Sequence, residues 1–234
     1  MNEHTVASDE SAGAYAQFRR LLDREDKEAC VQFAVTILGV RTLNLVSLYQ
    51  EVLAPAAREP FNAEHGRAVG VWEEHVRTSI LRTVIECCYP EVMRARKAVS
   101  GVRTRGSALI VCPAEEYHEL GARMASDFFT LCGFDVTFVG ANTPLNDVLD
   151  AVETIEPVYV GVSVTGPYNL IAARRTIQQL TARRSRSGGR FRIVAGGQAF
   201  GQDVNLAASL GADLLAQSFD DIRRLSEEIP WLSL

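Results

Sequence analysis

From residue 107 onward, short apolar runs alternate with helical patterns, and this alternation constrains the fold more than any other feature of the sequence. In the helical segments apolar residues recur every three or four positions, whereas the runs between them are short and continuous. The predicted strands are residues 107–112, 134–139, 158–163, 191–195 and 213–216. The predicted helices are residues 119–132, 145–155, 168–184, 202–210 and 219–228. This regular repeat predicts an α/β fold with a doubly wound, five-stranded parallel sheet in a flavodoxin-like (Rossmann-like) order.

The part of the chain before this repeat carries only helical patterns. Its predicted helices are residues 15–22, 24–39, 45–57, 63–89 and 91–99, with Pro90 separating the last two. Four or five amphipathic helices with short connections predict a helical bundle over residues 14–99. Residues 1–13 are small, polar and acidic, so we expect a disordered tail there. The polar segment 100–106, with two glycines, is the predicted boundary before an α/β domain over residues 107–234.

Composition narrows the class of protein. With 47% hydrophobic and 23% charged residues, the 234-residue chain can bury an ordinary core. Its formal net charge of −5 argues against a broad nucleic-acid surface, so direct nucleic-acid binding is not expected. No apolar run approaches the length of a membrane span and no secretory signal is found, so we expect a cytoplasmic protein without membrane contact. The five cysteines form no C-x-x-C pair and are expected to be reduced core residues.

One segment has a concentrated positive charge. Residues 183–190 contain four arginines together with serine and glycine. We expect a flexible loop there, which acts either as a solvated connection or as a contact for phosphate.

The stretch that follows the first predicted strand carries the candidate chemistry. His118 lies between Glu116 and Glu119, on a loop at the carboxyl edge of the predicted sheet. Open α/β folds bind their ligands at that edge. A neutral imidazole whose one ring nitrogen is held by a carboxylate has its other nitrogen free for a metal. A surface or helix-capping histidine is the alternative interpretation.

Three short motifs on successive strand ends resemble those of a known family. They are Glu116-x-His118-x-x-Gly121 after the first strand, Ser163-Val164-Thr165 after the third, and Gly196-Gly197 after the fourth. Together they resemble the signature of cobalamin-binding domains, whose first motif is usually Asp-x-His-x-x-Gly. The sequence departs from that signature by having Glu116 in place of aspartate. In this respect it resembles the light-sensing regulators of the family more than the methyl-carrying enzymes.

The resemblance implies roles for individual residues. His118 would coordinate cobalt from the lower face in place of the cofactor's own dimethylbenzimidazole, and Glu116, next to Tyr117, would steady the far ring nitrogen. The displaced nucleotide tail would need a slot lined by small or polar residues, for which the candidates are Ser163, Thr165, Gly166, Gly196, Gly197 and Gln198, while Gly121 would let a bulky group approach the helix backbone. An ordinary turn is the alternative for the two adjacent glycines, and Asn142 and Thr143 are expected to cap the next helix. The form of cobalamin (adenosyl-, methyl- or hydroxocobalamin) stays open.

The predicted bundle contains a second group of interest, Trp72, Glu74 and His75. Light-sensing cobalamin proteins have a Trp, nine intervening residues and then Glu-His, and these residues cover the upper face of the cofactor. Here Glu64 stands where that Trp would be, although the Glu74-His75 pair is present. The resemblance implies that the bundle caps the upper face, with His75 as a candidate upper cobalt ligand. Trp72 as an ordinary core residue is the alternative.

Three interpretations of the function remain open. The first is a cobalamin-binding sensor or regulator, a photoreceptor in the light-responsive case, which is not an enzyme and acts through a partner protein such as a transcription regulator. The second is a corrinoid protein that carries methyl groups as a subunit of a methyltransferase system. A binding module that has lost its cofactor is a third interpretation, which the intact His118, Gly196 and Gly197 disfavour. A homo-oligomer is compatible with either function.

Overall fold

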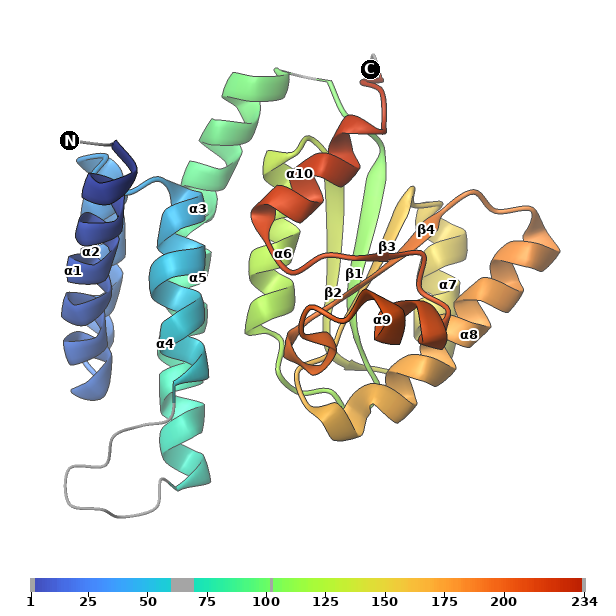
Figure 1. The fold of residues 1–234 in the computed structure, drawn as a ribbon, viewed down its shortest axis with the longest axis horizontal. Helices are drawn as coiled ribbons and strands as arrows, with labels where there is room; N and C mark the ends of the chain where they lie inside the picture. Colours follow the sequence, from blue (N-terminus) through green and yellow to red (C-terminus); the bar gives the residue numbers. More distant parts are fainter. Residues whose placement is uncertain (1–2, 60–69, 102, 233–234) are drawn as a thin grey trace. The chain divides into compact units, whose positions relative to one another are not determined.

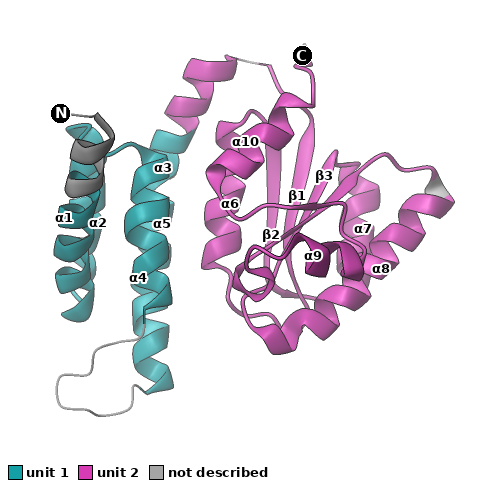
Figure 2. Cartoon of the chain, viewed as in Figure 1, with its two compact units in different colours: residues 1–92 teal, residues 93–234 magenta. Residues whose placement is uncertain are grey.

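The computed structural model describes residues 3–59, 70–101 and 103–232. The chain divides into two compact units, residues 1–92 and 93–234 (Figure 2). Within the described residues, no helix is both long enough and apolar enough to cross a membrane.

The first unit is entirely helical. Its elements are α1 (Glu3–Asp23), α2 (Lys27–Gly39), α3 (Leu45–Ser47), the π-helical segment η1 (Leu48–Leu53), α4 (Ala54–Arg58) and the first part of α5 (Val71–Ser100) (Figure 1). Side-chain caps begin two of them: Asp26 accepts a hydrogen bond from the Ala29 N–H at 3.0 Å, and Asn44 accepts one from the Ser47 N–H at 2.9 Å. The core is formed by fully buried residues of α1, η1 and α5, which include Phe18, Leu22, Leu48, Tyr49, Val52 and Val84.

Helix boundaries in this unit differ from the sequence expectation in two places. Helix α1 begins at Glu3, inside the segment for which the sequence predicts a disordered tail. Helix α5 is continuous through Pro90, where the sequence predicts a break. Pro90 lies on the exposed side of α5, so water can satisfy the carbonyl that loses its helical partner there. The start of the predicted fourth helix, residues 63–69, lies outside the described residues.

The second unit contains a five-stranded, all-parallel sheet. Its strands are β1 (Ser107–Pro113), β2 (Asp135–Thr143), β3 (Tyr159–Ser163), β4 (Arg192–Gly196) and β5 (Leu214–Leu215), in the order β2-β1-β3-β4-β5. The helices are α6 (Leu120–Leu131), α7 (Leu145–Ile155), α8 (Leu170–Ser187), α9 (Val204–Leu210) and α10 (Phe219–Glu227), with short 3-10 turns η2 (Pro167–Asn169) and η3 (Gln198–Phe200) (Figure 1). The predicted helical region and doubly wound parallel sheet are therefore confirmed.

Side-chain alternation along the strands builds a core on each face of the sheet. Leu109, Val111, Val160 and Val162 pack with buried residues of α7, α8 and α9. On the other face Phe129, Phe134 and Tyr159 form an aromatic cluster, and the Tyr159 hydroxyl donates a hydrogen bond to the Leu225 carbonyl of α10 at 3.0 Å. Helices α6 and α10, which contact each other, thus cover the face opposite α7, α8 and α9.

The predicted basic loop is instead mostly helical. Helix α8 continues to Ser187, and Gly188, with a φ of 68°, ends it in the left-handed conformation that glycine adopts at low cost. The expected loop over residues 183–190 is therefore wrong for its first five residues. Three of its four arginines, Arg183, Arg184 and Arg186, consequently lie on a helix.

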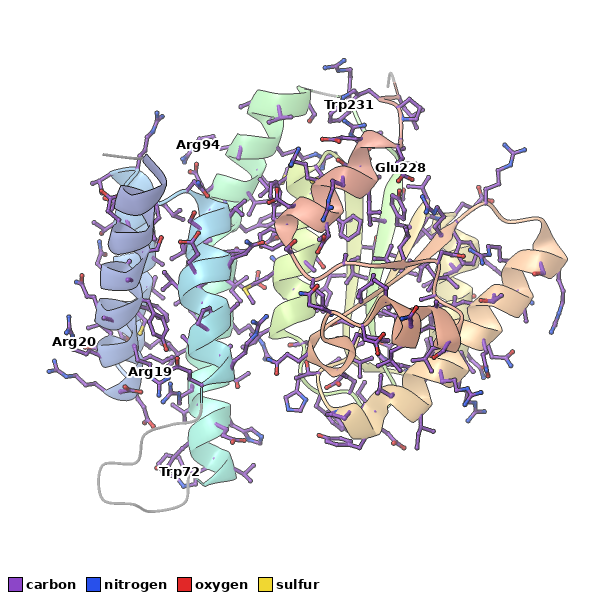
Figure 3. All side chains as sticks on the ribbon, viewed as in Figure 1. Arg19, Arg20, Trp72, Arg94, Glu228 and Trp231 are labelled. Atoms are coloured by element: carbon purple, nitrogen blue, oxygen red, sulfur yellow. The ribbon has the colours of Figure 1, made fainter. Side chains whose placement is uncertain are left out.

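The C-terminal segment packs beside the start of β1. Thr104 and Leu232 form an antiparallel bridge, and the Arg105 guanidinium lies 4.1 Å from the centre of the ring of Trp231, the residue labelled near the C-terminus in Figure 3. Gly133, with a φ of 96°, makes room for that ring, because a Cβ atom at this position would lie 2.3 Å from it. These contacts lie at the amino edge of the sheet, so the C-terminal segment leaves the carboxyl edge free for a binding site.

Candidate functional site

The loop between β1 and α6 is held in place by the next loop along the sheet edge. The Glu115 N–H donates a hydrogen bond to the Asn142 side-chain oxygen at 2.8 Å, and the Asn142 N–H donates one to the Glu116 carbonyl at 2.8 Å. Both Glu115 and Asn142 have positive φ angles, 69° and 51°, a conformation that asparagine tolerates better than most residues. Asn142 therefore joins two loops, and the expectation that it caps α7 is wrong because helix α7 has no side-chain cap bond.

Glu116 is fully buried and is the centre of the site's hydrogen bonds. One carboxylate oxygen accepts a bond from the His118 N–H at 2.8 Å and lies 2.7 Å from the His118 Nδ1. The other accepts bonds from the Thr165 N–H at 2.8 Å, the Gly166 N–H at 3.2 Å and the Asn169 side-chain amide at 3.0 Å. The loops after β1 and β3 are thereby joined through one carboxylate.

Two opposing effects act on the pKa of Glu116. Burial raises it, but the hydrogen bonds from Asn169, His118 and Thr165 together outweigh burial, so the pKa of Glu116 lies below its usual value. The carboxylate is consequently ionised at neutral pH. An ionised acceptor beside the His118 Nδ1 fixes the proton on that ring nitrogen.

The His118 side chain itself is 58% exposed, in contrast to the carboxylate behind it. With the proton on Nδ1, Nε2 carries the lone pair, and it has no hydrogen-bond partner among the described residues. Behind the loop, the Cys112 thiol donates to the His118 carbonyl at 3.9 Å. Burial, together with the charges of Glu116 and Glu119, raises the pKa of Cys112 to about 12, so this thiol stays neutral. The arrangement presents the Nε2 atom of His118 outward.

The surroundings of His118 suit a large, flat, metal-bearing ligand. Gly121, the second residue of helix α6, is exposed, and a Cβ atom added there would meet no atom within 4 Å. Tyr117 and Tyr168, from two loops of this edge, are 67% and 70% exposed, although both have large apolar rings. A corrin ring supplies four nitrogen ligands of its own, so a single imidazole is a sufficient protein ligand. The residues present therefore fit cobalamin.

The loops after β3 and β4 meet through glycine. Gly197 has a φ of 95°, and a Cβ atom there would lie 2.3 Å from the Val164 carbonyl oxygen. The two loops are joined by hydrogen bonds from the Val164 N–H to the Gly196 carbonyl at 2.9 Å and from the Ala199 N–H to the Val164 carbonyl at 3.1 Å. Backbone packing thus requires glycine here. The predicted contacts of Ser163, Gln198 and these glycines with a nucleotide tail stay predictions.

Asn169 is a site residue that no sequence motif indicated. It is only 3% exposed, and its side chain bonds the Glu116 carboxylate instead of capping helix α8. The available signal was a polar residue just before a helix that follows a strand end, which more often indicates a cap. Only the fold brings positions 116 and 169 together.

Trp72, Glu74 and His75 belong to the first unit, at the N-terminal end of α5 (Figure 3). All three side chains are exposed, and Trp72 is 60% exposed, so its interpretation as an ordinary core residue is wrong. The buried residue of this turn is Glu73, whose carboxylate accepts a hydrogen bond from the Gly70 N–H at 2.6 Å. Contact of the three exposed residues with the upper face of a cofactor stays a prediction.

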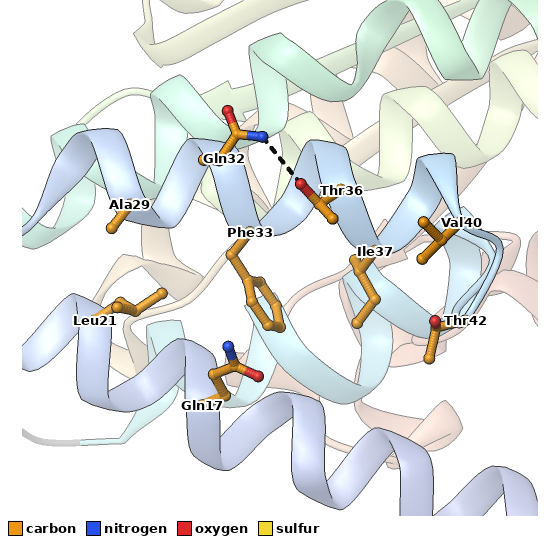
Figure 4. Close-up of a pocket in the computed structure, with 9 residues that line it drawn as sticks. All are labelled: Gln17, Leu21, Ala29, Gln32, Phe33, Thr36, Ile37, Val40 and Thr42. Carbon is orange, nitrogen blue, oxygen red and sulfur yellow. Dashed lines mark hydrogen bonds between the residues drawn. The ribbon is translucent and has the colours of Figure 1, made fainter.

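A pocket of about 490 Å³ lies in the first unit, away from these residues (Figure 4). It is lined by Gln17, Leu21, Ala29, Gln32, Phe33, Thr36, Ile37, Val40 and Thr42. Its polar groups are amides and hydroxyls, of which Gln32 and Thr36 bond each other at 3.0 Å. Across the described part of the chain, no three His, Cys, Asp or Glu side chains gather as a metal-binding group.

Comparison with known proteins assigns the second unit to a family. The B12 binding domain family matches residues 106–222. Among curated proteins, no match to the sequence is found. A monomethylamine corrinoid protein from Methanosarcina barkeri has the same fold, with 12% identity, a TM-score of 0.76, and coverage of 93% of this chain and 98% of that one.

Two further solved structures align over most of the chain with lower TM-scores. A cobalamin-binding protein from Desulfitobacterium hafniense DCB-2 is 17% identical, with a TM-score of 0.45 and coverage of 91% and 96%. A methanol:cobalamin methyltransferase complex from Methanosarcina barkeri is 12% identical, with a TM-score of 0.47 and coverage of 97% and 84%. The assignment rests on the family match, on the corrinoid-protein fold and on an imidazole set at the sheet edge. The chain belongs to the B12 binding domain family, and its cofactor is cobalamin.

Proposed function

We propose that this chain is a corrinoid protein that holds cobalamin through His118 and presents it to a methyltransferase partner. The observation that carries the proposal is the pair formed by buried, ionised Glu116 and exposed His118 in a B12 binding domain. The methyl-carrying role is supported by the fold that 93% of the chain shares with a monomethylamine corrinoid protein.

In this proposal each residue of the loop has a separate task. His118 would offer Nε2 to cobalt, and Glu116 would keep the proton on Nδ1 and the ring in one orientation. Thr165, Gly166 and Asn169 would hold the carboxylate in place. When bound, the cofactor supplies a cobalt ion that can accept and give up a methyl group.

The remaining predicted residues would receive the rest of the cofactor. Tyr117 and Gly121 would lie under the corrin ring, since one is an exposed aromatic and the other leaves open space. The nucleotide tail would pass beside the ends of β3 and β4, where Ser163, Gly196 and Gly197 are found. In this role the chain would be the corrinoid subunit of an enzyme system, because the reacting atom belongs to the cofactor.

A cobalamin-binding regulator is the second candidate function. Two features favour it: Glu116 stands where methyl-carrying relatives generally have aspartate, and Glu74 and His75 are exposed as a pair on α5. Glu64, which replaces the tryptophan of the light sensors, lies outside the described residues. Such a regulator would act on a partner protein, with light or the state of the cofactor as its signal.

Absorption spectroscopy tests the proposed cofactor site. The protein is incubated in darkness with hydroxo-, methyl- or adenosylcobalamin, freed of unbound cofactor by gel filtration, and compared with its His118→Ala variant. We expect bound cofactor with a spectrum shifted from that of free cobalamin, and at least a tenfold weaker affinity or loss of the shift in the variant, as a change of about 1.4 kcal/mol or more produces. Equal spectra and affinities for both proteins would refute His118 as the ligand.

A further inference from the structure

Helix α8 concentrates positive charge in a chain whose net charge is −5. Residues 170–192 contain seven arginines and no acidic residue. Three of these arginines form ion pairs with acids of other elements: Arg183 with Glu153, Arg184 with Asp213 at 2.5 Å, and Arg192 with Glu228. The other four, Arg174, Arg175, Arg186 and Arg190, are exposed and form no ion pair within the described residues. Their charge is available to something outside the chain.

These free arginines follow the solvent face of the helix. Arg174, Arg175 and Arg186 are spaced so that they share one side of α8, opposite the buried Ala173 and Ile177. Ile171, one turn earlier on the same side, is 81% exposed. We call this side the basic stripe of α8.

The neighbouring helix α7 has the opposite charge. Residues 145–156 contain four acidic residues and no basic one. Asp147, Asp150 and Glu153 recur every three residues on the exposed side, which we call the acidic stripe of α7. Asp147 and Asp150 form no ion pair within the described residues. Helices α7 and α8 are in contact on one face of the sheet, and the Arg183–Glu153 pair joins them (Figure 1).

The orientation of the two helices makes this face complementary to itself. Each helix connects two parallel strands of one sheet, so α7 and α8 run in the same direction. Consider a two-fold axis that lies in the plane of contact, midway between α7 and α8 and parallel to both. Rotation about it places the α7 of one copy on the α8 of another, and the helix directions stay the same. Such an operation brings the acidic stripe against the basic stripe twice, once at each equivalent contact.

We propose that this face is a self-association surface, on which the acidic stripe of one copy binds the basic stripe of a second copy. Charge complementarity supports this contact, because the acidic and the basic stripe are both present in every copy of the chain. A nucleic acid is less suitable, since the acidic stripe beside the arginines and the net charge of −5 would repel its phosphates. The Ile171 side chain adds apolar area at one end of the contact. The proposal does not depend on the methyl-carrying role.

Charge exchange between the stripes tests the proposal with the full chain. The wild type, Arg174→Glu/Arg175→Glu and Asp147→Arg/Asp150→Arg are compared by sedimentation velocity at low salt, singly and as a mixture of the two variants. Arg20→Glu/Arg24→Glu is the matched control for the arginine variant, because it makes the same change in net charge as Arg174→Glu/Arg175→Glu on exposed residues of the first unit. Circular dichroism checks that every variant is folded.

The proposed contact gives a specific pattern of masses. The wild type and the control should sediment as two chains, and added salt of about 0.5 M should return them to one chain, because exposed charges are screened. Each stripe variant alone should sediment as one chain, since both of its contacts join like charges. Their mixture should again give two chains, because both contacts of the mixed pair join opposite charges.

Three results would overturn the proposal. A wild type that stays a single chain at low salt and high concentration would exclude self-association. A dimer that survives in both stripe variants would place the contact on another surface. Retardation of a duplex oligonucleotide by a monomeric wild type, lost in Arg174→Glu/Arg175→Glu, would assign the basic stripe to nucleic acid instead.

Discussion

At the scale of single residues, the site depends on how one buried carboxylate is kept ionised. Glu116 has no exposed surface, and burial alone would favour its neutral form. The Glu116 carboxylate accepts hydrogen bonds from the backbone N–H groups of three residues and from the Asn169 side-chain amide, and these bonds favour its ionised form. The ionised Glu116 carboxylate in turn sets the tautomer and the orientation of the His118 ring.

Replacing Glu116 by glutamine should weaken the fold in a pH-dependent way. Because folding lowers the pKa of Glu116, its ionisation adds stability that is fully present above the unfolded value of about 4.3 and is lost as the pH falls through the folded value. We expect Glu116→Gln to lower the free energy of unfolding by about 2–3 kcal/mol at neutral pH, since charge-assisted hydrogen bonds are lost.

Urea unfolding of both proteins at pH 7 and at pH values below about 4 measures this difference. The gap should shrink at the lower pH, where the wild type also loses the charge. Asp135, Asp213 and Asp221, whose pKa values are lowered as well, are present in both proteins and cancel in the comparison. A gap of constant size would show that Glu116 acts through its shape and not through its charge.

Asn169 offers a second test of the same carboxylate. Asn169→Ala removes one donor but leaves the Thr165 and Gly166 N–H groups in place, so we expect a loss of about 1–2 kcal/mol in the free energy of unfolding. Asn169→Asp places a second carboxylate against Glu116 and should cost more at neutral pH. Thermal or urea unfolding gives the order, and an aspartate variant more stable than the alanine variant would contradict it.

At the scale of elements, the carboxyl ends of β1, β3 and β4 are joined by their own loops before any cofactor binds. The loop after β1 is tied to the loop after β3 through Glu116, and the loop after β3 is tied to that after β4 through Val164 and Gly197. The sheet edge is therefore a preformed platform. Substitutions inside this platform should lower the stability of the fold, whereas substitutions on its outer surface should weaken cofactor binding.

Gly197→Ala tests the platform itself. The added Cβ would lie 2.3 Å from the Val164 carbonyl oxygen at a residue whose φ is 95°. Both the clash and the positive φ are unfavourable, so we expect the variant to lose about 3 kcal/mol or more in the free energy of unfolding. Urea unfolding of the cofactor-free protein measures it. A loss below about 1 kcal/mol would mean that the two loops separate easily.

Gly121→Ala is the contrasting change, because it should stabilise the protein while harming its ligand site. Nothing lies within 4 Å of the new Cβ, and alanine favours the helix by about 0.5 kcal/mol or more over glycine. The methyl group would, however, occupy the space into which we expect the corrin ring to fit. Unfolding of the free protein should occur at higher urea, and cobalamin titration should show weaker binding. Unchanged affinity would remove Gly121 from the site.

The sequence predicted the elements of the second unit better than it predicted contacts or the first unit. All five strands were found because continuous apolar runs between helical patterns are a local signal. The hydrogen bond from Asn169 to Glu116 joins residues 53 positions apart, so no local pattern could indicate it. The predicted helix break at Pro90 was wrong because Pro90 lies in the middle of α5 but on its exposed side. Proline usually ends a helix since it lacks the backbone N–H, but here water can bond the carbonyl that loses its helical partner.

At the scale of the whole molecule, the chain combines a helical unit with a cofactor-binding sheet unit. The likeness to a corrinoid protein extends over 93% of the chain and so includes both units. Trp72, Glu74 and His75 on α5 are exposed side chains of the helical unit, and their contact with a cofactor is still a prediction. Whether they respond to the cofactor separates the carrier from the regulator.

Illumination of the alkylcobalamin-loaded protein tests that difference. A light-responsive regulator requires a residue that changes its contacts when light removes the cofactor's upper ligand, and His75 is an exposed imidazole suited to that position. A carrier requires no such change. Under the carrier function we expect wild type, His75→Ala and the control Ser79→Ala to give the same spectrum and the same hydrodynamic size after illumination. A change of both in wild type and Ser79→Ala, absent in His75→Ala, would assign the regulatory function, because a histidine that couples the two units is the two-state element that a switch needs.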